Sequence, residues 1–264
     1  MARNFNNSDS DRVNLGNVFS FDKDVPWTVV CFARYENLTV DERAVISKLE
    51  PGDSTNWQFE ILTKNTAPHK LVVYGSNFDI IITGGTTIAV DTWYLVGLVS
   101  TGGGTTDDYE LFALGMDGTV LENSVKGTPD PDSSNNAADV VIGGRMTSGD
   151  NHDGDVAHAA CFDEQWVLQD FKDYLHSPAR TAARHAANTI FYLPLIGVSP
   201  EPDFSPNTNT GTVAGTTISN GPPIGPLFGY GTDRGFTVAA VGGANPHNPL
   251  GHPLYGPLAG PVAA

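Results

Sequence analysis

The chain has 264 residues, and its 14 Lys and Arg residues against 30 Asp and Glu residues give a formal net charge of −16. This charge opposes binding to the phosphate backbone of nucleic acids and to anionic membrane surfaces, so the sequence predicts neither partner. Charged residues make up only 17% of the chain, below the roughly 25% of typical globular proteins, which leaves Asn, Ser, Thr and Gly to form much of the surface.

The N-terminal segment, MARNFNNSDSDR, lacks the apolar core of a secretory signal, and the chain has no apolar run long enough to span a bilayer. We therefore expect the protein to fold in the compartment where it is made. Cys31 and Cys161 allow one disulfide at most and cannot form a zinc cluster from thiolates alone. Because an intracellular chain meets a reducing pool, we expect two buried, reduced thiols.

Short apolar segments rich in branched and aromatic residues recur in the first third of the chain. WTVVCFARY at 27–35 is the strongest, and the turn clusters at 51–53, 75–77 and 84–85 separate the others. Short strands at such intervals are typical of a sandwich or barrel. The strands predicted here are 27–35, 44–49, 57–62, 71–74 and 78–82.

The segment from Asp91 to Asn123 contains the most specific structural signal. The apolar run that begins at Trp93 is short enough to be a buried strand, and three glycines at 102–104 end it. A second run at 109–116 leads to Asp117-Gly118, after which the strand composition resumes. An Asp-Gly pair between such runs predicts a two-residue type I′ hairpin, since both central residues need positive φ.

The second half of the chain contains the only helical periodicity. Apolar residues fall on one face from Glu164 to Leu175, and Asp163 is placed to cap this helix. Ser177-Pro178 predicts a second short helix over 179–187, with Pro at its first position. The polar, proline-containing stretch at 125–139 reads as a surface loop. Further strands are predicted at 140–142, 155–161 and 190–193.

The composition changes at Gly225, where Pro-Leu steps begin to recur with a period of four. Such a segment favours extended, polyproline-like chain, so we expect a folded domain over 1–224 and an extended C-terminal arm over 225–264. Its apolar groups predict docking across a neighbouring subunit, and the alternative is an arm folded back on its own sandwich. The residues predicted to dock are Pro249, Leu250, Pro253, Leu254, Tyr255, Pro257 and Leu258.

Taken in order, these elements resemble the concanavalin A-like jelly roll in its laminin G-like form, over about residues 12–196. The resemblance is carried by WTVVCFARY, AVISK, DTWYLVGLVS, LFALGMDGTVL and GDVAHAACFDEQWVLQDF. The closing FYLPLIG, SPEPDFSPN and NGPPIG resemble jelly-roll proteins of tailed bacteriophages. The implied fold is an all-β concanavalin A-like jelly-roll sandwich with one or two short helices and an extended Pro/Gly-rich C-terminal arm.

Catalytic motifs are missing from the sequence. Glucan hydrolases of this fold carry Glu, Asp and Glu alternating on one strand, and this chain has no such pattern. The acidic pairs at 107–108 and 163–164 are explained by a loop and by a helix start. The chain also lacks a Gly-x-Ser-x-Gly elbow, a phosphate-binding Gly-rich loop and a His-Glu-x-x-His motif. We therefore expect no enzyme activity, no catalytic residue and no cofactor.

One acidic run could bind a metal. Asp150, Asp153 and Asp155 lie just before a predicted strand, where laminin G-like domains can hold calcium at the sandwich rim. The spacing does not follow the EF-hand pattern, so a solvated turn is the default interpretation. We interpret His158 as a strand residue with a hydrogen-bond partner.

Exposed aromatic residues would indicate a glycan-binding surface. Trp57, Tyr74, Tyr109 and Trp166 are the candidates, but aromatic residues in a sandwich more often belong to the core. The sequence therefore names no sugar site.

Two functions from different classes remain. The first is a non-catalytic bacteriophage virion structural protein, a capsid decoration or other particle-surface protein held by its arm to copies of itself or to a capsid protein. The second is a lectin-like adhesion module that binds cell-surface glycans. Laminin G-like domains usually occur in secreted proteins, yet no signal is found here. This combination favours a virion protein, which is made in the host cytoplasm and leaves by lysis.

Overall fold

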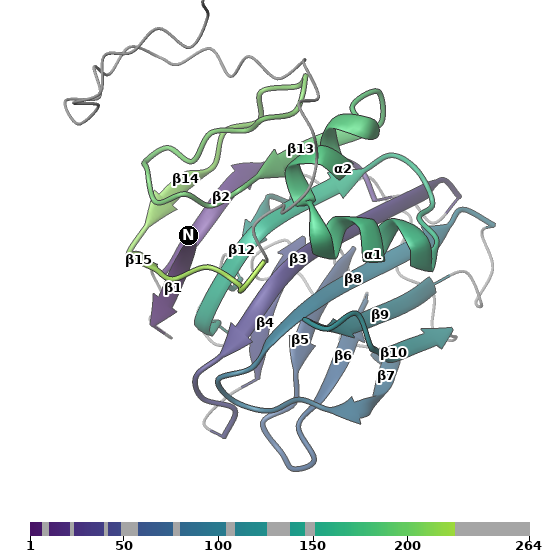
Figure 1. The fold of residues 1–264 in the computed structure, drawn as a ribbon, viewed down its shortest axis with the longest axis vertical. Helices are drawn as coiled ribbons and strands as arrows, with labels where there is room; N and C mark the ends of the chain where they lie inside the picture. The colour runs from purple at the N-terminus through teal and green to yellow at the C-terminus, as the bar shows by residue number, and fades with distance from the viewer. Residues whose placement is uncertain are drawn as a thin grey trace, which may run out of the picture. The chain divides into compact units, whose positions relative to one another are not determined.

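The computed structural model describes residues 1–6, 11–21, 24–39, 42–48, 58–75, 80–103, 109–125, 138–145 and 151–224. These residues form two antiparallel sheets packed face to face (Figure 1), which confirms the predicted all-β sandwich. Sheet A has the order β10-β9-β8-β3-β12-β1-β15, with β13 also paired to β12, and sheet B has the order β14-β2-β11-β4-β5-β6-β7. The strands are β1 (Ala2–Asn6), β2 (Arg12–Gly16), β3 (Pro26–Tyr35), β4 (Arg43–Lys48), β5 (Phe59–Thr63), β6 (Lys70–Tyr74), β7 (Ile80–Thr87), β8 (Trp93–Thr101), β9 (Tyr109–Gly115), β10 (Val120–Val125), β11 (Val140–Ile142), β12 (Asp153–Phe162), β13 (Thr189–Leu193), β14 (Thr212–Ala214) and β15 (Thr217–Ser219).

The strands of sheet A are apolar on both faces because each face is covered. On β3, Val29 and Cys31 belong to the core between the sheets, whereas Val30 and Phe32 belong to a second cluster on the outer face. This explains the continuous apolar run of the strand, since a strand that is buried on one face only would alternate with polar residues. Cys31 and Cys161 are both buried, as predicted, and both are free.

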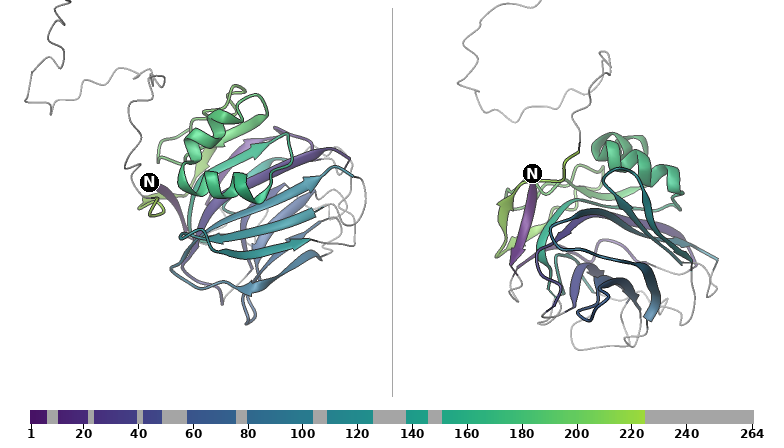
Figure 2. Two further views of the ribbon diagram at one scale, coloured as in Figure 1. Left: turned by 45° about the vertical axis from the view of Figure 1, so that its right-hand side comes forward. Right: turned by 60° about the horizontal axis from the view of Figure 1, so that its bottom comes forward.

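Two short helices cover part of the outer face of sheet A. They are α1 (Leu168–His176) and α2 (Pro178–Arg184), and in Figure 2 they lie on the side of sheet A away from sheet B. Phe171 of α1 stacks on Phe112 of β9, with ring centroids 4.5 Å apart. Gly97 of β8 lies beneath the same ring, since a Cβ atom at Gly97 would come within 2.3 Å of it. The missing side chain of Gly97 therefore lets α1 approach the sheet closely.

The predicted start of the first helix is wrong. Its N-cap is Val167 rather than Asp163, and the Val167 N–H donates to the carboxylate of Asp170 at 3.0 Å. The preceding residues stay outside the helix because the Thr28 hydroxyl donates to the Glu164 carbonyl at 2.8 Å and accepts the Trp166 N–H at 3.0 Å. Helix α2 begins after Ser177 as predicted, but it ends at Arg184, before the predicted end at residue 187.

The β9–β10 hairpin is confirmed, but the type I′ turn is wrong. Gly115 donates its N–H to the Thr119 carbonyl at 2.9 Å, which closes a three-residue loop. Only Gly118 in this loop has positive φ, at 81°. Asp117 instead accepts the Thr119 N–H at 2.9 Å through its carboxylate. A three-residue loop that ends in a left-handed glycine is a common alternative to the two-residue turn.

The turn predicted at residues 84–85 is wrong. Strand β7 continues through Gly84-Gly85 instead of ending there. The Glu122 carboxylate of β10 accepts the N–H groups of Gly85 and Thr86, the latter at 3.0 Å, and so joins the two sheets at this edge. A Cβ atom at Gly84 would come within 2.8 Å of the same carboxylate. The glycines are therefore sites of close approach within a strand.

Strands β1, β2 and β15 were not predicted, and β1 is secured by a buried ion pair. Arg3 Nε lies 2.6 Å from a carboxylate oxygen of Glu201, and both side chains are almost fully buried. The other Glu201 oxygen accepts the Ile196 N–H at 3.0 Å. This pair holds the segment that follows β13 against the first strand of the chain.

One histidine of the described residues, His152, is fully buried, and His158 is half-buried. His152 packs edge-on against Phe5 and Tyr35, and its Nε2 lies 3.1 Å from the Arg34 carbonyl oxygen. His158 lies in β12 with φ of 48°, and its Nδ1 is 2.9 Å from the Tyr192 hydroxyl, which confirms that it is a strand residue with a partner. Burial lowers the pKa of each imidazole to about 4.

We expect Gly97→Ala to destabilise the fold by about 1–3 kcal/mol, because the added methyl group collides with Phe171 and overpacks the helix–sheet interface. Gly85→Ala is the matched control, since its Cβ would have only one ordinary contact, at 3.7 Å. Denaturant unfolding of both variants measures the difference. Equal stabilities would contradict the close packing of α1.

We also expect the free energy of unfolding to fall as the pH drops from about 6.5 toward 4. In this range the unfolded chain takes up protons on histidines that stay neutral in the folded protein, at a cost of about 3 kcal/mol for each fully shifted group. His152→Gln or His158→Gln should each reduce the slope of stability against pH, whereas His176→Gln, at an exposed site, should not. An unchanged slope in both core variants would refute this.

Candidate functional site

The helices do not reach the part of the outer face of sheet A at the lower left in Figure 1, where β1, β3, β8 and β12 end or begin. Residues paired across neighbouring strands share one face of a sheet. Arg34 pairs with both Trp93 and Asp155, Asp155 pairs with Asn4, and Asn4 pairs with Thr217. We call these five residues, which cross β8, β3, β12, β1 and β15, the Arg34 row.

Arg34 is the centre of this row. Its Nε donates to Asp155 at 2.6 Å, its Nη2 contacts Glu36 at 2.5 Å, and its Nη1 donates to Asp91 at 3.0 Å. Burial lowers the pKa of the guanidinium, but the hydrogen bond and charge of Asp155, together with the charges of Glu36 and Asp91, outweigh burial and raise it. Arg34 is therefore a fixed cation that holds three carboxylates in place, and we count Glu36 and Asp91 with the Arg34 row from here on.

Asp155 connects the row to the edge of the sheet. Its Oδ1 accepts the Asn4 side-chain amide at 3.0 Å and the Ser219 hydroxyl at 2.6 Å, while its Oδ2 accepts from Arg34. The side chain is only 1% exposed. A buried carboxylate with this many donors is a structural anchor rather than a free ligand group.

The groups that reach solvent surround this anchor. The Glu36 and Asp91 side chains are 41% and 70% exposed, and Trp93 packs its partly buried ring against the outer cluster of sheet A. Asn4 connects the buried Asp155 to the exposed Glu36, because its side-chain amide donates to both, to Glu36 at 3.2 Å. The row therefore places a half-buried tryptophan beside several fixed hydrogen-bonding groups.

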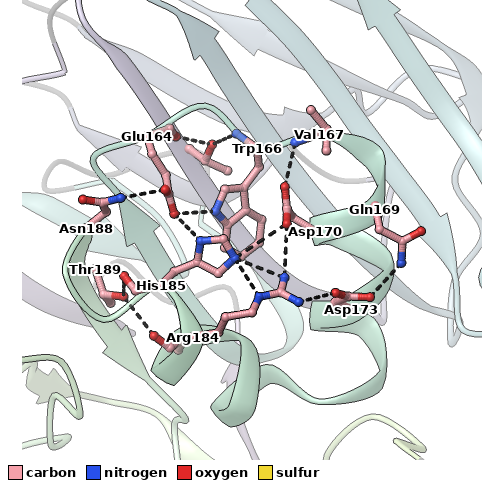
Figure 3. Close-up of polar contacts among 12 residues, drawn as sticks. Glu164, Trp166, Val167, Gln169, Asp170, Asp173, Arg184, His185, Asn188 and Thr189 are labelled. Carbon is pink, nitrogen blue, oxygen red and sulfur yellow. Dashed lines mark hydrogen bonds and ion pairs between the residues drawn. The ribbon is translucent and has the colours of Figure 1, made fainter.

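A second polar cluster lies where α1 and α2 meet the sheet (Figure 3). Glu164 accepts the Trp166 indole N–H at 3.2 Å and the Asn188 amide at 2.7 Å. His185 Nδ1 lies 2.5 Å from the same carboxylate, and Arg184 Nε donates to His185 Nε2 at 3.2 Å.

Arg184 completes the cluster by pairing with Asp170 at 3.1 Å and Asp173 at 2.5 Å on α1. The hydrogen bond and charge of Arg184, with a hydrogen bond from Gln169, lower the pKa of Asp173. Every charged group in this cluster contacts another member of the cluster. The cluster therefore has a structural role, which is to fix α2 to α1.

A third cluster lies on sheet B. Lys64 Nζ is 2.5 Å from Glu42 and also contacts the Tyr74 hydroxyl, which donates to Glu42 at 3.2 Å. Tyr74 is buried with Leu62 and Val72 in a small apolar cluster. Its ring is therefore packed rather than available to a ligand.

The residues predicted as sites have mixed outcomes. Tyr109 and Trp166 are each 1% exposed, so for them and for buried Tyr74 the core interpretation is confirmed. Trp57, Asp150 and the predicted docking residues of the arm lie outside the described residues. Of the other predicted calcium ligands, Asp155 is bound to Arg34, and Asp153 lies 3.7 Å from Arg43. In the described part of the chain, no three His, Cys, Asp or Glu side chains form a group that could hold a metal ion.

Sequence reasoning missed the Arg34 row. Trp93 was assigned to a buried strand and Arg34 to a strong apolar strand, and Asn4 lies in a strand that was not predicted. The sequence does contain a signal for this row, namely polar residues at the ends of apolar strands. Arg34 interrupts the apolar run of one strand, and Asp91 and Thr92 come directly before Trp93 at the start of another. Polar residues at strand ends often mark the border of a covered surface.

No helix within the described ranges is long and apolar enough to cross a membrane. No protein-family model matches the chain, and no curated protein sequence matches it. Solved structures, in contrast, are similar to the chain in fold. The chain is similar to a candidate carbohydrate-binding protein from Bacteroides ovatus, at 16% identity and a TM-score of 0.59, over 83% of this chain and 59% of that one.

Two further structures are similar at lower scores. The enzymatically active domain of tailspike protein 2 from bacteriophage CBA120 has 11% identity and a TM-score of 0.49, over 64% of this chain and 26% of that one. The CBM40 domain of a Ruminococcus gnavus sialidase, bound to α2,3-sialyllactose, has 12% identity and a TM-score of 0.44, over 58% and 84%. This chain thus spans about six tenths of the Bacteroides protein, and that likeness shows a shared sandwich fold.

Proposed function

We propose that the chain is a non-catalytic, lectin-like module that binds glycans through the Arg34 row. The observation that carries this proposal is the half-buried Trp93 side chain next to a set of side chains held by Arg34. Similarity to the Bacteroides protein concerns the fold, so the proposal depends on the chemistry of the row.

A sugar ring offers two kinds of surface to a protein. Its C–H faces pack on aromatic rings, and its hydroxyl groups donate to carboxylates and amides or accept from amides and guanidinium groups. Trp93 supplies the first contact, and Glu36, Asp91 and Asn4 supply the second. Because Arg34 and Asp155 hold these groups on paired strands, little ordering is needed when a ligand binds.

A virion structural protein is the second candidate, and the Pro-Leu steps of the arm favour it. A stiff, apolar, extended segment loses less entropy on docking than a flexible tail of equal length. In this proposal the sandwich over 1–224 is displayed on a bacteriophage particle, and the arm over 225–264 attaches it to a neighbouring subunit. The two candidates are compatible, because a particle-surface protein can also bind glycans.

We expect Trp93→Ala to weaken glycan binding by about tenfold, the loss that removal of one aromatic contact of about 1.5 kcal/mol produces. Binding is first detected on a broad glycan array and then measured by titration calorimetry. Phe204→Ala is the control, because Phe204 is 58% exposed but lies outside the row. Asn4→Ala, which keeps the indole, tests the hydroxyl contacts. Absence of any glycan ligand, or full affinity in both row variants, would overturn the proposal.

We expect a chain truncated after Ile224 to remain folded and soluble but to fail to assemble onto particles. The described strands and helices all lie before this point, so the sandwich keeps its core. Circular dichroism checks the fold, and co-sedimentation with intact particles measures assembly. Full occupancy of particles by the truncated chain would contradict the docking role of the arm.

A further inference from the structure

The charge balance of the Arg34 row favours one class of ligand. One guanidinium faces three carboxylates, those of Asp155, Glu36 and Asp91, at 2.5–3.0 Å. The site therefore carries a local excess of negative charge, on a chain whose formal charge is already −16. An incoming anion meets repulsion both at the row and at long range.

Arg34 is not available to offset this repulsion. Its Nε and both Nη atoms already contact carboxylate oxygens. The contact with Asp155 is the firmest, because Asp155 is 1% exposed and its release would leave a buried carboxylate without its cation. A carboxylate or sulfate on a ligand would have to compete with this pair, so Arg34 is a poor clamp for anions.

The groups that remain for a ligand are mainly acceptors. Within the described residues, the carboxylates of Glu36 and Asp91 are bonded through one oxygen each, and both side chains reach solvent. Carboxylates accept hydrogen bonds and cannot donate them. Hydroxyl groups satisfy such acceptors, whereas acidic groups do not.

We propose that the Arg34 row selects neutral, hydroxyl-rich glycans over glycans that carry a carboxylate or sulfate, and that Glu36 and Asp91 determine this specificity. This inference rests on the proposed glycan-binding function. It specifies the ligand class, and it assigns the selection to two residues that can be changed without disturbing the buried Asp155.

The test compares pairs of related glycans, one neutral and one acidic, such as lactose with sialyllactose and glucose oligomers with glucuronate oligomers. We expect the natural protein to bind the neutral member at least tenfold more tightly. In the double variant Glu36→Gln, Asp91→Asn, affinity for the acidic member should rise at least tenfold, while affinity for the neutral member changes less than threefold. Asn also suits position 91, where φ is 55°.

The matched control is Asp117→Asn, Asp163→Asn, which makes the same change in net charge at two exposed positions outside the row. We expect this control to keep the preference for neutral glycans. Equal gains in both double variants would show a general charge effect and overturn the role of Glu36 and Asp91. A natural protein that binds acidic and neutral members equally would overturn the inference alone, whereas one that binds no glycan would overturn the proposed function as well.

Discussion

Burial of sheet A on both faces is the constraint on which the rest of this structure depends. Sheet B covers its inner face, and α1 with α2 covers part of its outer face, so the middle of β3 and β8 must be apolar throughout. The helices are too short to cover the whole sheet. Where they end, the outward positions of the same strands change from Phe32 to Arg34 and from Leu95 to Trp93. The Arg34 row is thus the boundary of the covered region, and its polar groups must satisfy one another or the solvent.

The ion pair between Arg34 and Asp155 is the centre of this boundary. It joins β3 to β12, and through Asn4 and Ser219 it reaches β1 and β15 at the sheet edge. On the opposite face of β1, Arg3 pairs with buried Glu201. The first strand of the chain is therefore held by a buried charge on each face. Breaking the Arg34–Asp155 pair or the Arg3–Glu201 pair would leave a buried carboxylate without its cation. These pairs therefore tie the short, polar strands β1 and β15 to the sheet.

The sequence predicted what depends on local patterns and missed what depends on distant contacts. Apolar runs identified β3, β8 and β9, because their short length and their content of branched and aromatic residues favour a buried strand over a buried helix. Strands β1, β2 and β15 contain too few apolar residues for this signal, and they become strands by pairing with β12, β11 and β1. The start of α1 was misplaced because the hydroxyl of Thr28, far away in the chain, binds the Glu164 carbonyl and the Trp166 N–H and holds these residues outside the helix. The Arg34 row was missed for the same reason, because exposure at a strand end depends on where a helix stops covering the sheet.

The calcium hypothesis shows how a sequence pattern and a site can share residues yet differ in chemistry. Closely spaced aspartates suggest a cation, and Asp155 does have one beside it, the guanidinium of Arg34. A guanidinium differs from a metal ion in two respects. It is covalently part of the sheet, so the site is ordered without a ligand, and its planar donors fix the orientation of each carboxylate. Carboxylates oriented in this way keep their outward oxygens as hydrogen-bond acceptors. The aspartates that suggest a calcium site in the sequence are thus part of a guanidinium-centred network in the fold.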